Sequence, residues 1–405
     1  AGQGTFLSIV AAATRWRWRT HCSSTTMTKV TMHGLVLILT LVWSALVGSM
    51  ALIMPSLCLL VLPFDGSRML YRQWSAYVAK MWFTLATLMI ERYAKVKIVL
   101  SGDDLPYAEP AMIVCNHRTR IDWMFMWCLC LRLGLLNCMK IVLKDSLKSI
   151  PGFGWAMQSF LFVFLARDKS IDLKHMGEML GYHTNNKLPL SLILFPEGTD
   201  LSPHNMAKSD AFASQNGLTK YRHVLHPKVI GWARSISLLR ATCPAVYDVT
   251  IAYHDYEEGE RPSELSLLSS RYPREVHLHV QRHPMSLMPE SPAEVEEWIK
   301  QSFARKEKRL HQFYGNSKTF GPPSKPPIDE VEIENLWRQS LMFWSLASVL
   351  VLVSFFLVFG WFLAAFSAIV WVLLTKAGGV DIIELWLHGE RGLYRRLIET
   401  QDKFD

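Results

Sequence analysis

Two long apolar stretches lie near the two ends of the chain, and a region of mixed polarity separates them. The first, residues 31–64, contains no Lys, Arg, Asp or Glu and exceeds the roughly 20 residues that a helix needs to cross a bilayer. We expect this helix to kink or end at Pro55, because proline has no amide hydrogen to donate. A secretory signal peptide would have a shorter apolar core, of about 7–15 residues. The pattern therefore predicts a transmembrane anchor.

The second stretch carries no charged residue from position 340 to position 375. Gly360 lies near its middle, so the pattern fits one tilted helix, a re-entrant segment or a two-helix hairpin. After the first stretch, residues 75–90 are also apolar, but they include Lys80 and are short for a span. They predict an interfacial or core helix.

The region between the stretches, residues 91–327, alternates short runs rich in β-branched residues with longer segments of mixed polarity. Such alternation is typical of an α/β domain with a sheet at its centre. Residues 292–310 combine spaced apolar positions with many charges, which predicts an amphipathic helix whose charged face lies in solvent. The predicted strands are residues 96–100, 111–116, 190–195, 247–253 and 274–280.

Changes in charge and proline content mark the borders of these parts. Lys and Arg flank both apolar stretches on both sides, so the sequence predicts no orientation in a membrane. The expected segments are a basic tail of non-native or poorly ordered sequence at 1–30, the anchor at 31–64, an interfacial helix region at 65–90, the α/β domain at 91–320, a proline-rich linker at 321–337, a transmembrane segment or hairpin at 338–376, and a polar tail at 377–405.

Composition narrows the class of protein. The 405 residues are 50% hydrophobic and carry a formal net charge of +8. Positive charge suits nucleic acid, an anionic membrane surface or a phosphorylated substrate, and the high hydrophobic content favours the last two. Seven cysteines are too few and too scattered for a disulfide framework. Cys128, Cys130 and Cys138 lack the partners of a zinc-ribbon site, so we expect buried small side chains and no metal centre.

The first candidate for chemistry is VCNHRTRIDWMF, where a predicted strand ends at Asn116 and His117 and Asp122 follow. Histidine is the usual general base near neutral pH. In one regular helix the two side chains would point about 140° apart, so they meet only if His117 lies in the loop before a helix that begins near Asp122. Thr119 as N-cap would place Asp122 at the third helical position. By spacing alone, a structural or surface pair is the commoner outcome.

The second candidate is LSLILFPEGTDLS, where an apolar strand ends in Glu197, Gly198 and Thr199. Ligand sites of α/β sheets lie at the carboxyl ends of strands, so these residues are placed to hold a polar head group. The alternative is a turn that only caps a buried strand. Arg167 ends another apolar run, and its planar guanidinium suits phosphate.

Together, NHRTRID and FPEGTD resemble the glycerolipid (1-acylglycerol-3-phosphate) acyltransferase family, whose first motif is N-H-x-x-x-x-D. The two motifs stand in the order of that family, with Arg167 between them and the apolar stretches outside. The resemblance implies an α/β acyltransferase domain with a central mixed sheet, flanked by N- and C-terminal transmembrane helices. It implies catalytic roles for His117 and Asp122 and substrate-binding roles for Glu197, Gly198, Thr199 and Arg167.

The resemblance also implies the reaction. A fatty acyl group passes from acyl-CoA, which is a co-substrate and not a bound cofactor, to the free hydroxyl of a lysophospholipid. Segments such as KDSLKSIPGFGWAMQ and PREVHLHVQRHP resemble family members that act on lysocardiolipin. The expected acceptor is therefore an anionic lysophospholipid, namely lysocardiolipin, lysophosphatidylinositol or lysophosphatidylglycerol. The implied partners are these substrates and membrane lipid, with no metal and no nucleic acid. The implied location is the endoplasmic reticulum membrane.

Three other functions stay open from the sequence. An acyltransferase of phosphatidate synthesis would share both motifs and use lysophosphatidate as its acceptor. A non-catalytic lipid-binding membrane protein would keep the fold without turnover. A transporter is disfavoured, because the apolar stretches are few and the polar domain between them is large.

Overall fold

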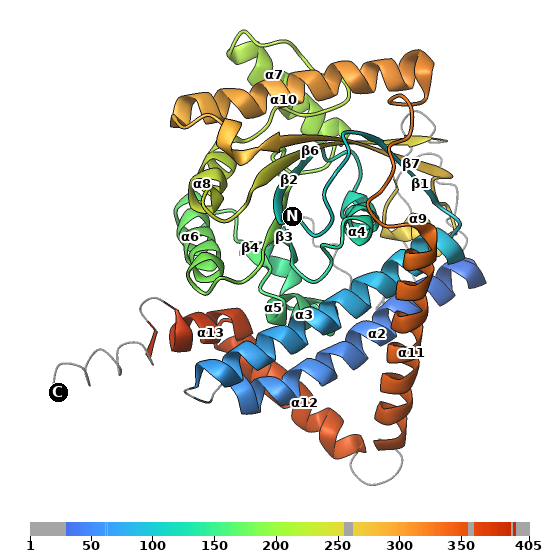
Figure 1. Ribbon diagram of the computed structural model, residues 1–405, viewed down its shortest axis with the longest axis vertical. Coiled ribbons are helices and arrows are strands. Elements are labelled where there is room, and N and C mark those ends of the chain that lie inside the picture. Colours follow the sequence, from blue (N-terminus) through green and yellow to red (C-terminus); the bar gives the residue numbers. More distant parts are fainter. Residues whose placement is uncertain are drawn as a thin grey trace, which may run out of the picture.

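A mixed seven-stranded sheet lies at the centre of the protein, with strands in the order β1-β7-β6-β2-β5-β3-β4 (Figure 1). The computed structural model describes residues 30–60, 62, 64–254, 262–354, 360–389 and 392–393, so the predicted basic tail lies almost wholly outside the described residues. The sheet confirms the predicted α/β class. Its strands are β1 (Lys97–Gly102), β2 (Ala111–Cys115), β3 (Met139–Lys144), β4 (Val163–Leu165), β5 (Ser191–Leu194), β6 (Ala245–His254) and β7 (Glu275–Pro284).

Five of the strands, β2 to β6, run in one direction. Strand β2 pairs in parallel with β5 and β6, and β3 pairs in parallel with β4 and β5. Strand β7 is antiparallel to β6, and β1 is parallel to β7. The five strands predicted from sequence are all present, and β3 and β4 are additional. The loops that follow the five parallel strands therefore emerge at one edge of the sheet.

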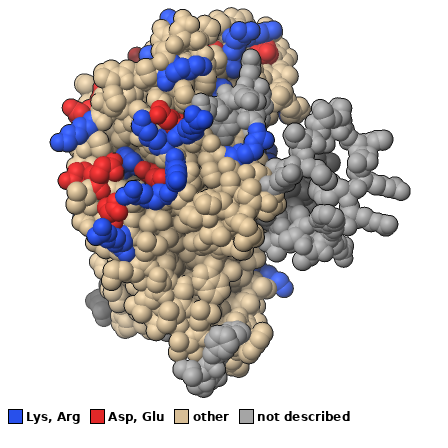
Figure 2. All heavy atoms as spheres, turned by 90° about the vertical axis from the view of Figure 1, so that its right-hand side faces the viewer, with Lys and Arg blue, Asp and Glu red and all other residues tan. Residues whose placement is uncertain are grey.

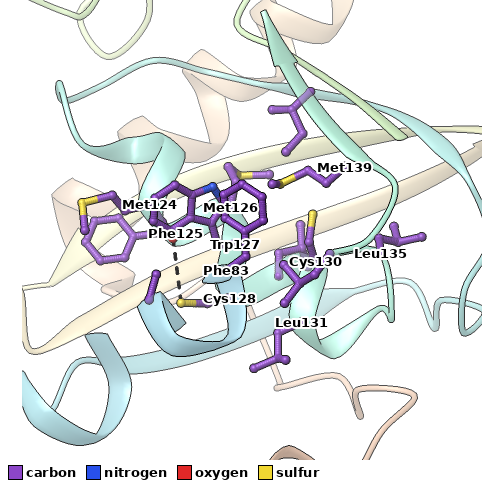
Figure 3. Packing of buried hydrophobic residues seen from close by; sticks show 14 of the residues in the cluster. Phe83, Met124, Phe125, Met126, Trp127, Cys128, Cys130, Leu131, Leu135 and Met139 are labelled. Carbon is purple, nitrogen blue, oxygen red and sulfur yellow. Dashed lines mark hydrogen bonds between the residues drawn. The ribbon is translucent and has the colours of Figure 1, made fainter. Parts of the chain in front are cut away.

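One face of the sheet is covered by α3 (Asp65–Leu88) and α4 (Asp122–Arg132), with α2 (Met32–Pro55) and α5 (Phe153–Ser159) in the same apolar cluster. Figure 3 shows how α4 side chains interlock with Phe83 of α3, whose ring centroid lies 5.0 Å from that of Trp127. Helix α3 is thus a core helix, one of the two alternatives that the sequence left for this segment. Cys128, Cys130 and Cys138 are buried free thiols, as expected.

The other face is covered by α6 (Lys169–Asn185), α8 (Val229–Leu239) and α10 (Pro292–Gln312). Helix α10 has the predicted amphipathic pattern, with one apolar face against the sheet. Lys306 departs from the expectation of a fully solvated charged face: it is buried, and its Nζ donates to the carbonyl oxygens of Val114 and Val249. Two more helices are α7 (Pro203–Gln215) and α9 (Glu264–Leu268). Short helical segments are η1 (Ser56–Leu60), η2 (Met89–Tyr93), η3 (Asp145–Leu147), η4 (Met285–Leu287) and η5 (Phe313–Ser317).

Helices α2 and α12 (Gly360–Lys376) lie below the sheet in Figure 1, and the helix labelled α11 (Glu330–Ser354) runs down beside them. Within the described residues, α2 and α11 are long and apolar enough to cross a membrane. Helices α12 and α13 (Val380–His388) pass the same test only as a pair that is bent by 64°. Figure 2 shows charged side chains gathered on the upper part of one face of the molecule, above a lower part that is almost free of them. This distribution fits a lower part that contacts lipid.

The helix borders refine the predicted segments. Helix α2 ends at Pro55, as expected. Helix α11 begins at Glu330, inside the predicted linker, and the predicted segment at 338–376 contains two helices, which fits the hairpin alternative. Residues 355–359, between them, lie outside the described residues. Helix α13 occupies the start of the segment predicted as a polar tail, because Asp381 and Glu384 are buried and paired with Lys148 and Arg72 instead of facing water.

Candidate active site

His117 and Asp122 meet at the carboxyl end of β2. Asn116 first ties the loop to β6, because its side-chain amide accepts from the Ile251 N–H (2.9 Å) and donates to the Ile251 carbonyl oxygen (3.2 Å). His117 then lies in the loop, and α4 begins at Asp122, the arrangement that the sequence required for contact. The prediction that Thr119 is the N-cap is wrong, since Ile121 holds that position and Asp122 is the first helical residue.

The His117–Asp122 contact is a hydrogen bond of 2.9 Å between the ring Nδ1 and the carboxylate Oδ2. The Asp122 side chain is fully buried, whereas that of His117 is 18% exposed. Buried carboxylates need hydrogen-bond donors, and Asp122 has three more of them. Its oxygens accept from the Thr119 N–H (2.8 Å), the Thr119 hydroxyl (2.6 Å) and the Tyr253 hydroxyl.

The surroundings of His117 favour its protonated form. Burial alone lowers the pKa of the imidazole, but the hydrogen bond that Nδ1 donates to Asp122 and the negative charge of Asp122, with smaller effects of Glu197 and Asp200, outweigh it. The net effect is a raised pKa. The ring also packs on Phe195, with centroids 4.6 Å apart. Because a carboxylate only accepts hydrogen bonds, Nδ1 carries the hydrogen in the neutral ring and Nε2 is left to take a proton.

Glu197 joins the second motif to the first. Its Oε1 accepts from the His117 backbone N–H (2.7 Å), and its Oε2 accepts from the Leu225 N–H (2.9 Å). The side chain is only 2% exposed. Burial raises the pKa of Glu197 to about 8, although the two backbone N–H groups act in the opposite direction. The carboxyl group thus connects three loops, those that follow β2 and β5 and the loop that contains Leu225.

Gly198 and Thr199 form the turn after β5 in the way their residue types allow. Gly198 has φ +72°, a conformation that side chains rarely adopt, and a Cβ added there would lie 2.9 Å from the Lys228 Nζ. The Thr199 hydroxyl accepts from the Asn205 side-chain amide (2.8 Å). The Leu201 N–H donates to the His117 carbonyl oxygen (2.9 Å), so the turn is fastened to the catalytic loop from both sides of Thr199.

Arg167 lies farther along the same edge. It follows β4, which β3 separates from β5, so at about 4.8 Å per strand it is about 10 Å from the turn after β5. Its side chain is exposed, and its backbone N–H donates to Asp172 Oδ2 (3.0 Å). In the part of the chain that the structure describes, Arg167 does not join the hydrogen bonds around His117. An exposed guanidinium at this place can contact a large ligand that reaches along the edge.

Two donors to Asp122 were not identified from the sequence. Thr119 lies inside the first motif but was interpreted as a helix cap. Tyr253 lies at the carboxyl end of a predicted strand, so the rule that placed Glu197 at the site also applies to it. The residues described contain no group of three or more His, Cys, Asp or Glu side chains placed to hold a metal ion. The arrangement places a histidine, held by a buried carboxylate, beside a rigid turn, where the imidazole can serve as a general base.

Comparisons with known proteins identify the family of the chain. The family described as "Acyltransferase" matches residues 97–252, and "Acyltransferase C-terminus" matches residues 266–344. Lysocardiolipin acyltransferase 1 of Gallus gallus is 36% identical over 89% of this chain and 95% of its own length. Lysophosphatidylinositol acyltransferase 10 of Caenorhabditis elegans is 32% identical over 88% of this chain and 94% of its own. A solved structure, the 1-acyl-sn-glycerophosphate acyltransferase PlsC of Thermotoga maritima, is 19% identical over 69% of this chain and 98% of its own, with a TM-score of 0.39.

The first matched region contains all the site residues that the sequence analysis named. His117, Asp122, Arg167, Glu197, Gly198 and Thr199 all fall within residues 97–252. Relatives at this level of identity, aligned over nearly their whole length, share the family of the chain. The protein is therefore an acyltransferase and belongs to the family of the lysocardiolipin and 1-acylglycerol-3-phosphate acyltransferases.

Proposed function

We propose that this acyltransferase moves a fatty acyl chain from acyl-CoA to the free hydroxyl of an anionic lysophospholipid. The observation that carries the proposal is the 2.9 Å hydrogen bond between His117 Nδ1 and Asp122 Oδ2, next to a backbone that Glu197 holds in place. A base with a free Nε2 at the carboxyl edge of a sheet is what deprotonation of a hydroxyl requires.

The reaction needs no covalent acyl-enzyme, because the acceptor supplies the nucleophile. His117 Nε2 takes the hydroxyl proton as the hydroxyl oxygen attacks the thioester carbonyl carbon. The tetrahedral intermediate collapses with cleavage of the carbon–sulfur bond. The imidazolium, stabilised by Asp122, returns the proton to the leaving thiolate, and the products are a diacyl phospholipid and free CoA. Holding the hydroxyl and the thioester together supplies much of the remaining rate enhancement.

The acceptor is expected to bind at the turn after β5. Gly198 and Thr199 line this turn, and Glu197 fixes it against the His117 loop, which supports a joint role in placing the head group. Arg167 would contact phosphate of whichever substrate extends along the edge. The relatives named for lysocardiolipin and lysophosphatidylinositol favour a remodelling enzyme over one of phosphatidate synthesis.

The enzyme is further proposed to work in a membrane, in the endoplasmic reticulum as the family resemblance implies. Helices α2 and α11 meet the length and hydropathy that a span requires. The face in Figure 2 changes from charged to almost uncharged along one direction, as at a lipid boundary. A site beside that boundary would receive lysolipid from the bilayer and acyl-CoA from water.

Acyl transfer by the detergent-purified protein tests the function. Oleoyl-CoA is offered with lysocardiolipin, lysophosphatidylinositol, lysophosphatidylglycerol or lysophosphatidate, and CoA release and the lipid product are both measured. We expect acyl transfer to the first three acceptors. The rate of transfer should fall at least 100-fold in His117→Ala, which is the scale of general base catalysis. His204→Ala, which removes an exposed histidine on α7, is the matched control and should keep full activity.

Each result separates the functions that the sequence left open. Transfer to lysophosphatidate alone would assign the protein to phosphatidate synthesis. Full activity in folded His117→Ala would refute the mechanism. Lysolipid binding without transfer would favour a non-catalytic lipid-binding protein.

A further inference from the structure

Tyr253 links Asp122 to strand β6. It is the penultimate residue of β6, it is buried, and its hydroxyl donates to Asp122 Oδ1. The ring packs edge-on against Phe125 of α4, with centroids 5.5 Å apart, which fixes the direction of the hydroxyl. Asp122 Oδ2, by contrast, is the oxygen that faces His117. Tyr253 therefore holds the carboxylate from the side opposite to the histidine.

Tyr253 is itself held by the region that follows the catalytic domain. The Tyr314 hydroxyl in η5 accepts from the Tyr253 backbone N–H (3.0 Å). The Arg118 guanidinium lies over the Tyr314 ring, 4.0 Å from its centroid, and Arg118 is the neighbour of His117 in the chain. Tyr314 belongs to the matched region at residues 266–344, so this second region contacts Arg118, the chain neighbour of His117, and Tyr253, the partner of Asp122.

We infer that Tyr253 is a positioning residue for acyl transfer, which keeps the Asp122 carboxylate aimed at His117, and that Tyr314 supports it from the C-terminal region. The inference rests on the proposed function, because it concerns the orientation of the proposed base. Tyr253 touches neither substrate in this role and acts only through Asp122. The second matched region thereby contributes to catalysis through the Tyr314–Tyr253 contact.

Loss of the Tyr253 hydroxyl has two expected consequences. Asp122 keeps its two bonds from Thr119, so it stays near His117, but Oδ1 then has the Thr119 hydroxyl as its one remaining donor among the bonds described, and the carboxylate is held less firmly in the productive orientation. The Asp122 carboxylate also accepts one hydrogen bond fewer, so its negative charge interacts more strongly with the His117 imidazolium. The other charged groups that face His117, Glu197 and Asp200, are unchanged.

The test compares Tyr253→Phe with Tyr247→Phe. Tyr247 is a buried tyrosine on the same strand, but its hydroxyl donates to Glu109 (2.7 Å) at the end away from the site. We expect Tyr253→Phe to lower kcat about tenfold, the effect of one lost hydrogen bond to a charged group, with the KM for both substrates unchanged. Tyr247→Phe should keep the wild-type kcat. Thermal unfolding in detergent shows whether each variant is folded.

A second readout does not depend on turnover. The reaction of His117 with diethyl pyrocarbonate requires neutral imidazole, and mass spectrometry of the His117 peptide gives the rate at each pH. In Tyr253→Phe the midpoint of this pH dependence should lie at higher pH than in wild type, and in Tyr247→Phe it should not move. A wild-type midpoint in Tyr253→Phe, or a fall in kcat equal to that of Tyr247→Phe, overturns the inference. If wild type transfers no acyl group, the proposed function fails and the midpoint alone decides the role of Tyr253.

Discussion

Two buried carboxylates, Asp122 at the catalytic edge and Glu384 on α13, show how differently one chemical group is used in this protein. Both side chains are fully buried. Asp122 is held by hydroxyl and amide donors and by His117, with no Lys or Arg among its recorded partners. Glu384 forms an ion pair with Arg72 of α3 (3.0 Å) and accepts from the Tyr182 hydroxyl of α6.

The difference lies in what each partner can do. Arg72 is always charged and is 6% exposed, so its pair with Glu384 can only join helices. His117 can gain and lose a proton near neutral pH, and it is partly exposed. A buried carboxylate therefore does not mark an active site by itself. What distinguishes a candidate active site is a carboxylate whose partner titrates near neutral pH and is accessible to solvent.

The comparison predicts its largest effect for Asp122→Asn. The amide can present its NH2 to His117 Nδ1 and so favour the wrong tautomer, and it no longer stabilises the imidazolium. We expect kcat to fall by roughly 1000-fold while the protein stays folded. Steady-state CoA release and thermal unfolding of the same preparation measure the two quantities. A loss of folding in proportion to the loss of activity would give Asp122 a purely structural role.

Glu384→Gln should show the reverse pattern. Removing this charge leaves the Arg72 guanidinium buried without its ion-pair partner, a change that costs about 3 kcal/mol in comparable buried pairs. We expect a lower unfolding temperature and an unchanged kcat for the folded fraction. Glu178→Gln on the exposed side of α6 is the matched control and should alter neither. A large fall in kcat with unchanged stability would show that α13 takes part in the reaction.

Much of the catalytic edge could be predicted because strand direction and motif spacing determine it. Asn116 ends an apolar run, His117 follows, and Glu197 ends a second run that proves to be the neighbouring strand. Helical geometry gave only the condition for a contact between His117 and Asp122, a loop position for the histidine, and the family resemblance supplied the expectation that the two residues act together. The identity of the Asp122 donors was not predicted, because Thr119 was interpreted as a helix cap and no local pattern pairs Tyr253 with Asp122, 131 residues away in the chain.

The charged positions of the helices were harder to predict, since local pattern does not report distant partners. Lys306 has the periodicity of a solvated residue, yet it is buried because Asp248 and two strand carbonyl oxygens satisfy its charge. Asp381 and Glu384 likewise follow an apolar segment and resemble a polar tail, but they meet Lys148 and Arg72 from elements far earlier in the chain. Such pairs depend on tertiary contacts that a single sequence does not reveal.

The smallest and most specific prediction concerns pH. His117 must be neutral to accept the hydroxyl proton, and its pKa is raised above the ordinary value of 6.5, because Asp122, Glu197 and Asp200 outweigh the opposing effect of burial. The value of kcat/KM should therefore rise with pH through a midpoint above 6.5 and level off once the imidazole is neutral. The residual activity of Asp122→Asn should show this rise at lower pH, because the carboxylate that favours the imidazolium is gone. Initial rates of CoA release between about pH 5.5 and 8.5 at constant ionic strength measure both curves. A midpoint well below 6.5 in wild type, or equal midpoints in wild type and Asp122→Asn, would contradict a base that Asp122 controls.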